Sequence, residues 1–347
     1  MSGKSELLLP LLVLAAAMGA TACSDEATAP SGIRPDLATT ATGYRAIDLG
    51  TLGGSFSIAF GINRSGQVVG ESHIATGRSR AFLWSGGTMR DLGTLGGNFA
   101  RAFGISDGGK VVGSAATGSG QHHAFLWSAG VMRDLGTLGG GFSQANAINS
   151  AVQVVGLSST AASTGLVPVN HAFIWQNGVM RDLGTLGGDY SQAYGINPLG
   201  QVVGESETAD GRIHAFVWAN GVMTDLGPTG GKSQAFAINR SGRVGGSSAK
   251  GPRATIWVDG QRRLWGPSGE VSAIFGLNAA GLAVGVSQMS GENRAALWIK
   301  GTMSILPALA GGNAHGQAFA INREKRVVGA STTTTGQEHA TLWIPQE

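Results

Sequence analysis

The heptapeptide DLGTLGG occupies residues 48–54 and returns unchanged at 91–97, 134–140 and 182–188. Degenerate copies follow as DLGPTGG at 225–231, LWGPSG at 264–269 and LPALAGG at 306–312. A motif that recurs at a fixed interval predicts a repeat architecture, so the repeat has to be interpreted before any single residue.

Two further markers recur in a fixed order with this heptapeptide. One is a segment of the type A/G-F-G/A-I-N, which ends at Asn63, Ser106, Asn149, Asn197, Asn239, Asn278 and Asn322. The other ends on a tryptophan: Trp84, Trp127, Trp175, Trp218, Trp257, Trp298 and Trp343. Successive tryptophans lie 39 to 48 residues apart, which sets the length of one unit.

One unit divides into four short strands. Residues 190–227 contain YSQAYGIN, QVVGESE, HAFVW and VMTDLG, separated by the loops PLG, TADGRI and ANG. Short apolar runs bounded by Gly, Asn and Pro are typical of strands and hairpins. Four strands in each of seven units predict an all-β, seven-bladed β-propeller over residues 44–347.

The two ends of the chain suggest how the ring closes. Trp343 is followed only by IPQE, whereas the other tryptophans precede a further strand that ends at the heptapeptide or its degenerate copy. The missing strand is present as YRAIDLG at 44–50, ahead of the first complete unit. We therefore expect residues 44–50 to join the last blade, which would cover an otherwise open sheet edge.

The N-terminus has the layout of an export signal. An apolar run at 7–20 follows a single Lys and leads to Cys23, the chain's one cysteine. ATAC at 20–23 resembles a bacterial lipobox, which would make 1–22 a lipoprotein signal peptide and Cys23 the lipid attachment site. An ordinary signal peptide with a chance cysteine is the alternative. Residues 23–43 are rich in Ala, Thr, Ser and Pro and are expected to form a flexible tether. By resemblance to envelope lipoproteins, Ser24 favours the outer membrane or cell surface.

Charge argues against a nucleic-acid partner. The chain has 24 basic and 21 acidic residues among 347, and neither sign forms a block. A surplus of three charges is too small for the basic footprint of a nucleic-acid-binding protein.

The motifs HAF at 123–125, 171–173 and 214–216, DLGTLGG, and INxxGxVVG resemble those of the bacterial HAF-repeat proteins. The resemblance covers about 300 residues. It implies an extracellular repeat protein, and it brings no set of functional residues.

Each repeated polar residue has a structural and a functional interpretation. The corner aspartates could bind cations or cap their turn, and the capping role is favoured because each corner has one carboxylate: Asp48, Asp91, Asp134, Asp182 and Asp225. His123, His171, His214 and His339 occupy one repeat position, so they are too far apart to share a zinc ion and are expected to bond a neighbouring turn. The tryptophans are expected to pack between blades, with carbohydrate platforms as the alternative.

One slot on the predicted inner strand is a candidate binding position. It holds Arg101, Gln144, Gln192, Gln234 and Gln317. These side chains could line the central channel and bind a polar ligand, or they could bridge blades.

The leading hypothesis is a non-catalytic, lipid-anchored module that requires no cofactor or metal. It would bind an envelope polymer, a glycan or a protein through the variable loops between the second and third strands of each unit. A structural or assembly scaffold is the first alternative. A glycan-acting enzyme is the second, and it would need carboxylates that converge only on folding.

Overall fold

The computed structural model describes residues 39–40, 43–162, 169–227, 231–248, 251–310 and 315–346. Every regular element in these residues is a β-strand, so the predicted all-β class is confirmed. The chain divides into Met1–Leu37 and Ala38–Glu347, and all described residues belong to the second unit. The predicted signal peptide and Cys23 lie outside the described residues. No helix in the described ranges is long and apolar enough to cross a membrane.

Four consecutive antiparallel strands form each of the first six repeats. The first repeat contains β3 (Gly53–Ile62), β4 (Val68–Ile74), β5 (Ser79–Ser85) and β6 (Thr88–Asp91). The second contains β7 (Gly96–Ile105), β8 (Val111–Thr117), β9 (His122–Ser128) and β10 (Val131–Asp134). The third contains β11 (Gly139–Ile148), β12 (Val154–Thr160), β13 (Asn170–Gln176) and β14 (Val179–Asp182). The fourth contains β15 (Gly187–Ile196), β16 (Val202–Thr208), β17 (Ile213–Ala219) and β18 (Val222–Asp225).

The same order continues in the C-terminal part. The fifth repeat contains β19 (Ser233–Ile238), β20 (Val244–Ser248), β21 (Arg253–Val258) and β22 (Gln261–Leu264). The sixth contains β23 (Ser272–Leu277), β24 (Ala283–Met289), β25 (Glu292–Ile299) and β26 (Thr302–Ile305). The last contributes β27 (Gly316–Ile321), β28 (Val327–Thr332) and β29 (Glu338–Pro345).

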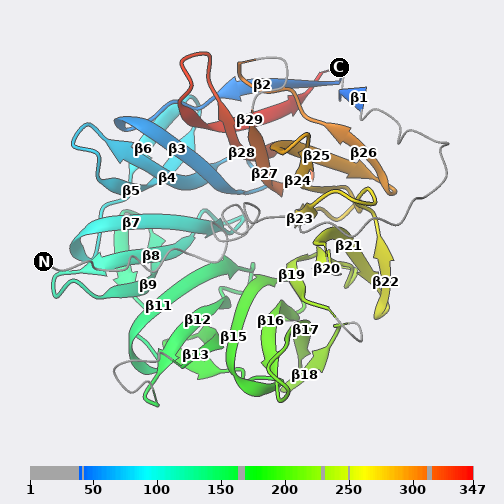
Figure 1. Cartoon of the computed structure of the whole chain (residues 1–347). Helices are drawn as coiled ribbons and strands as arrows, with labels where there is room; N and C mark the ends of the chain where they lie inside the picture. Colours follow the sequence, from blue (N-terminus) through cyan, green and yellow to red (C-terminus); the bar gives the residue numbers. More distant parts are fainter. Residues whose placement is uncertain are drawn as a thin grey trace, which may run out of the picture. The chain divides into compact units, whose positions relative to one another are not determined.

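A segment from the other end of the described chain adds the fourth strand to this last sheet. Strand β2 (Tyr44–Asp48) pairs antiparallel with β29, from Tyr44 opposite Pro345 to Asp48 opposite Thr341. The two-residue strand β1 (Thr39–Thr40), which falls within the segment predicted to be a tether, pairs parallel with β26. Figure 1 shows the sheets around a common centre that their first strands face. Each first strand contacts those of the neighbouring repeats, and β27 contacts β3.

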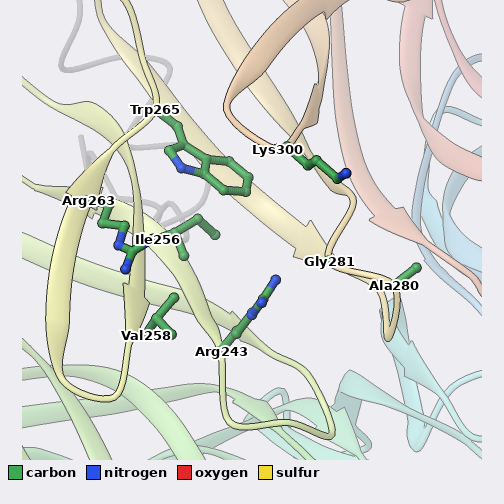
Figure 2. A pocket seen from close by; sticks show the side chains of 8 residues that line it. All are labelled: Arg243, Ile256, Val258, Arg263, Trp265, Ala280, Gly281 and Lys300. Atoms are coloured by element: carbon green, nitrogen blue, oxygen red, sulfur yellow. The ribbon is translucent and has the colours of Figure 1, made fainter.

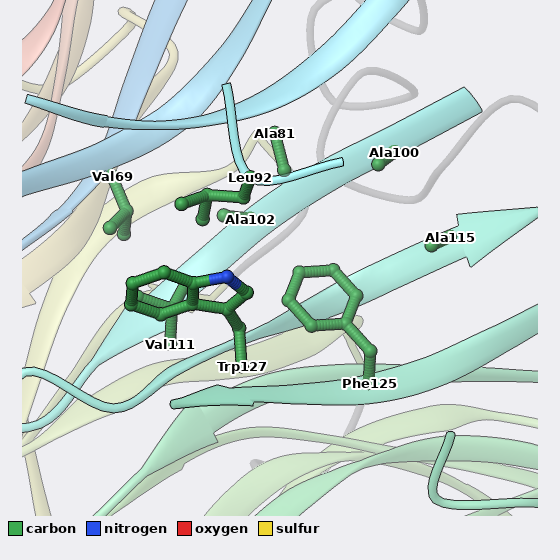
Figure 3. Close-up of a cluster of buried hydrophobic side chains, with 9 residues drawn as sticks. All are labelled: Val69, Ala81, Leu92, Ala100, Ala102, Val111, Ala115, Phe125 and Trp127. Carbon is green, nitrogen blue, oxygen red and sulfur yellow. The ribbon is translucent and has the colours of Figure 1, made fainter. Parts of the chain in front are cut away.

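The hydrophobic core lies between consecutive sheets. In the cluster of Figure 3, Val69 and Leu92 of the first repeat pack against Ala102, Val111 and Trp127 of the second. Every repeat tryptophan takes part in one such cluster. Because burial of one large apolar side chain contributes about 1.5–3 kcal/mol, these clusters hold neighbouring repeats together.

The glycine that ends each VVG sequence marks a very close approach of two strands. The pairing of first and second strands shifts register at a bulge, as between Ala102 and Gly104. A Cβ atom at Gly113 would overlap the carbonyl oxygen of Arg101, and one at Gly156 would overlap that of Gln144. Glycine is required at these positions because any side chain would displace the inner strand.

Candidate functional site

The corner aspartates join two sequence motifs. The Oδ1 atom accepts a hydrogen bond from the backbone N–H two residues later, at 2.6–2.8 Å, in Asp48, Asp91, Asp134, Asp182 and Asp225. The Oδ2 atom is hydrogen-bonded to the histidine of the HAF motif or its variant in four corners: His339 for Asp48, His123 for Asp134, His171 for Asp182 and His214 for Asp225. In the fifth, Arg80 forms an ion pair with Asp91. Both oxygens are therefore engaged within the fold. Among the described residues, no three His, Cys, Asp or Glu side chains gather as a metal site would require.

The repeat tryptophans are largely enclosed. Trp257, Trp298 and Trp343 are 0–1% exposed, and Trp127 and Trp175 are also buried. Trp84 and Trp218 are half-buried. Indole faces enclosed between sheets are not free to stack on a sugar.

The inner-strand slot forms a polar layer made of separate hydrogen-bonded groups. Arg101 forms an ion pair with the buried Glu71. The amide of Gln144 donates to Asn146 Oδ1 at 2.7 Å. Gln144, Gln192 and Gln234 are 0–4% exposed, so they contact mainly protein groups, whereas Gln317 is half-buried.

A buried carboxylate collects several of these groups. Glu205 Oε1 accepts hydrogen bonds from the hydroxyls of Tyr194 at 2.7 Å and Tyr190 at 3.3 Å, and Oε2 accepts from Gln234 Nε2 at 2.8 Å. Tyr190 also donates to Gln192 Oε1 at 2.8 Å. Burial, followed by the nearby Glu205 charge, raises the pKa of both tyrosines. The carboxylate of Glu205 is therefore held by uncharged hydrogen-bond donors.

This tyrosine cluster was not predicted from the sequence. A signal was present, because the chain has only three tyrosines and two of them lie four residues apart in one repeat. Tyr190 takes the place that Phe56, Phe99 and Phe142 hold in earlier repeats. The partner Glu205 comes from the adjacent strand, opposite Gln192.

A belt of aromatic rings lies next to the polar layer, two residues further along the first strands. The ring centroids are 5.0–5.5 Å apart along the series Phe103, Phe60, Phe319, Phe275, Phe236 and Tyr194. Asn146 takes the equivalent position in the third repeat and donates to Ala193 O at 2.8 Å. Side chains from successive repeats therefore meet around the common centre.

The variable loops lie on the same side of the sheets as the DLGTLGG crossings. Isolated bridges join Leu52 to Ile74, Leu95 to Thr117, Leu138 to Thr160 and Leu186 to Thr208. Each bridge links a crossing to the end of a second strand, where the variable loop begins. Residues 163–168 of the loop at 160–170 lie outside the described residues.

Histidines on this loop side rest on inner-strand aromatic rings. The rings of His122 and Phe99 have centroids 4.9 Å apart, as do those of His73 and Phe56. Burial lowers the pKa of His122, and the charges of Arg101 and His123 lower it further. His122 is therefore held in an environment that favours the neutral imidazole.

Comparison with protein-family models and with curated protein sequences finds no match. Solved structures do match. The β-propeller domain of the Trilobed protease from Pyrococcus furiosus aligns with 70% of this chain and 81% of its own, at 10% identity and a TM-score of 0.53. YCF48 bound to D1 peptide aligns with 90% of this chain and 100% of its own, at 11% identity and a TM-score of 0.53.

The fold is that of a β-propeller. A puromycin-hydrolyzing peptidase from Mycobacterium tuberculosis also matches, with a TM-score of 0.56 and 11% identity over 87% of this chain. This chain spans about half (56%) of that peptidase. At such identities the propeller likeness concerns the fold alone.

Proposed function

We propose that residues 44–347 form a seven-bladed propeller of four-stranded blades, closed by β2 on β29, that acts as a non-catalytic binding module. The observation that carries the binding role is the position of the variable loops. They are gathered beside the crossings on one side of the sheets, where the bridges from Leu52, Leu95, Leu138 and Leu186 hold their bases. Variable loops on a rigid scaffold are the usual place for recognition.

The hydrogen bonding of the inner-layer carboxylates supports a non-catalytic role. A glycan-acting site would need a carboxylate free to transfer a proton and a second one free to act as base or nucleophile. Glu71 is paired with Arg101, and Glu205 is held by two tyrosines and Gln234. Both glutamates are 2–3% exposed, which favours a structural task for them.

We further propose that the module is exported and anchored by lipid at Cys23, at the outer membrane or cell surface, as a member of the HAF-repeat group. Its partner would be an envelope polymer, a glycan or a protein. The peptide held by YCF48, which has the same fold, supports a peptide segment as one kind of partner.

The test is a binding array of glycans, envelope polymers and envelope proteins, probed with the full chain carrying Cys23→Ser. Both retention and breakdown of each polymer are scored. We expect a polymer or protein to be retained without breakdown. Replacing loops 75–78 and 333–337 by Gly-Ser should abolish retention. Leu199→Ser, on an exposed turn at the other end of the strands, should not affect it. Breakdown of any polymer, or retention that survives the loop replacement, contradicts the proposal.

A further inference from the structure

A cavity of about 590 Å³ lies between the fifth and sixth sheets (Figure 2). Its lining includes Arg243, Arg263 and Lys300 together with Trp265, Ile256 and Val258. Arg243 and Lys300 belong to turns at the end of the strands opposite to the variable loops. The cavity thus extends from these turns to Trp265 in the degenerate corner at 264–269, and its volume is within the range of small-ligand pockets.

The cavity opens where the repeat departs from its own pattern. The fourth strand and corner of the first four repeats read TMRDLG, VMRDLG or VMTDLG, whereas the fifth reads QRRLWG at 261–266. Register places Arg262 opposite Trp257, where Met223 lies opposite Trp218 in the preceding repeat. Trp265 follows this strand at the position that Leu226 holds in the fourth repeat. The backbone N–H of each residue donates to a carbonyl at the start of its own third strand.

Three cations surround the cavity without an acidic partner. In the described part of the chain, no Asp or Glu forms an ion pair with Arg243, Arg263 or Lys300. In earlier repeats, two of the three arginines equivalent to Arg263 contact an indole. Arg90 and Arg133 cover the indoles of Trp127 and Trp175 at 5.8 and 5.6 Å.

Two of these cations lie at or against turns with a left-handed backbone. Lys300 has a φ of 51°, a left-handed conformation that favours Gly, Asn and Asp, and Asn177 and Asn220 occupy the equivalent turns. A Cβ at Gly281 would come within 2.8 Å of Arg243 Nη1, so the guanidinium lies against this turn. Lys300 thus brings its ammonium group to the cavity from a turn position that Asn fills in two other repeats.

An aromatic wall accompanies the charges. The half-buried indole of Trp265 lies across Gly301, with ring atoms 3.6–3.8 Å from where a Cβ would stand. The half-buried Val258 adds apolar surface below it, while Ile256, also in the lining, is 1% exposed (Figure 2). The cavity thus combines a flat apolar face with strong hydrogen-bond donors.

We infer that this cavity binds an acidic saccharide. A pyranose ring presents a flat C–H face that can stack on one indole, its carboxylate or sulfate suits the guanidinium forks, and its hydroxyls can accept from the lysine. Inorganic phosphate or an acidic side chain would use the cations but leave the indole unused. The inference does not rest on the proposed loop-side function.

The test is calorimetric titration of the full chain carrying Cys23→Ser with trigalacturonic acid. A neutral galactose trisaccharide, ATP and hexaglutamate serve as comparison probes. The acidic trisaccharide should bind more tightly than the other three, and its affinity should fall as salt is raised because charges contribute.

The decisive variants take the residue that the fourth repeat has at the same position. Arg263→Thr matches Thr224, Trp265→Leu matches Leu226, and Lys300→Asn matches Asn220. Each should weaken trigalacturonate binding at least about tenfold. Lys300→Asn should weaken binding while raising the melting temperature, because it also relieves the turn.

Arg181→Thr, an exposed arginine in the same strand slot of another repeat, is the matched control and should leave binding unchanged. Replacing the variable loops at 75–78 and 333–337 should also leave it unchanged, which separates this test from that of the proposed function. Equal binding of the neutral sugar, tighter binding of ATP or hexaglutamate, no binding at all, or an equal loss in Arg181→Thr would overturn the inference.

Discussion

The side-chain amide of Asn322 donates a hydrogen bond to the backbone carbonyl of Asn63 at 3.1 Å, although 259 residues separate them. The same bond links each of the other repeat asparagines to the corresponding residue of the next repeat: Asn63 to Ser106, Asn149 to Asn197, Asn197 to Asn239, Asn239 to Asn278, and Asn278 to Asn322. The Oδ1 atom of each asparagine accepts a hydrogen bond from the backbone N–H four residues later. In the last repeat, Arg326 N donates to Asn322 Oδ1 at 2.9 Å. One residue type therefore closes its own turn and ties neighbouring repeats together.

Ser106 is the one break in this series, and completing it should stabilise the fold. Its Oγ accepts from Lys110 N at 3.1 Å, but serine has no amide to reach the carbonyl of Asn149. Ser106→Asn should raise the free energy of unfolding by about 1 kcal/mol, the net value of a typical hydrogen bond. Urea unfolding measures this, with Ser106→Ala as the control that should be less stable than the wild type. A Ser106→Asn protein no more stable than the wild type would contradict the expected bond.

The VVG glycines should not tolerate even a methyl group. Gly113→Ala should cost about 3 kcal/mol or more, because the Cβ would overlap the Arg101 carbonyl and force β7 away from β8. Gly118→Ala, in the loop of the same repeat with no atom within 4 Å of the new Cβ, should change stability by less than about 0.5 kcal/mol. Thermal and urea melts of the two variants provide the comparison, and similar losses in both would refute the steric explanation.

Removing one tyrosine hydroxyl should reveal how strongly the buried Glu205 depends on its donors. Tyr194→Phe removes a 2.7 Å hydrogen bond to that carboxylate and should lower the free energy of unfolding by about 1.5–3 kcal/mol. Tyr44→Phe removes a bond to the neutral carbonyl of Lys325 and should cost about 0.5–1.5 kcal/mol. Urea unfolding at pH 7 measures both variants; a loss in Tyr194→Phe no larger than in Tyr44→Phe would argue against a charged acceptor.

Stability should fall with acidification partly through His122. Burial lowers the pKa of this histidine in the folded state from its ordinary value of 6.5. The folded state therefore binds the proton less well, so the contribution is present above about pH 6.5 and is lost as the pH falls through the lowered pKa. His122→Gln should show a smaller decrease in melting temperature than the wild type between pH 7.5 and pH 5. Parallel pH profiles for the two proteins would exclude this role.

Local patterns were sufficient for much of the architecture. The all-β class follows from short apolar runs separated by turn residues, such as the NRSG turn at 63–66, because strands and hairpins depend on neighbouring residues. The pairing of β2 with β29 could also be predicted, because the motif order left Trp343 without a following strand and 44–50 without a preceding one. Repetition made these inferences possible, because each unit repeats the evidence of the others.

The candidate sites were less predictable for a physical reason. Glu205 on β16 is hydrogen-bonded to Tyr190 and Tyr194 on β15 and to Gln234 on β19, so the group draws on three strands of two repeats. The cavity at Trp265 likewise includes Lys300 from the next sheet. Gln144 and Gln192 were candidates for ligand contact, yet they lie buried among protein groups.

The sequence by itself determined the repeat, its strands and the glycines and asparagines that its turns require, because these depend on backbone geometry over a few residues. Only the tertiary structure decided which side chains meet, as with Asn322 and Asn63, or Trp265 and the cations around its cavity. Such contacts depend on the distance and angle between whole sheets, which arise from the packing of all repeats together and leave no mark in any one segment of the chain.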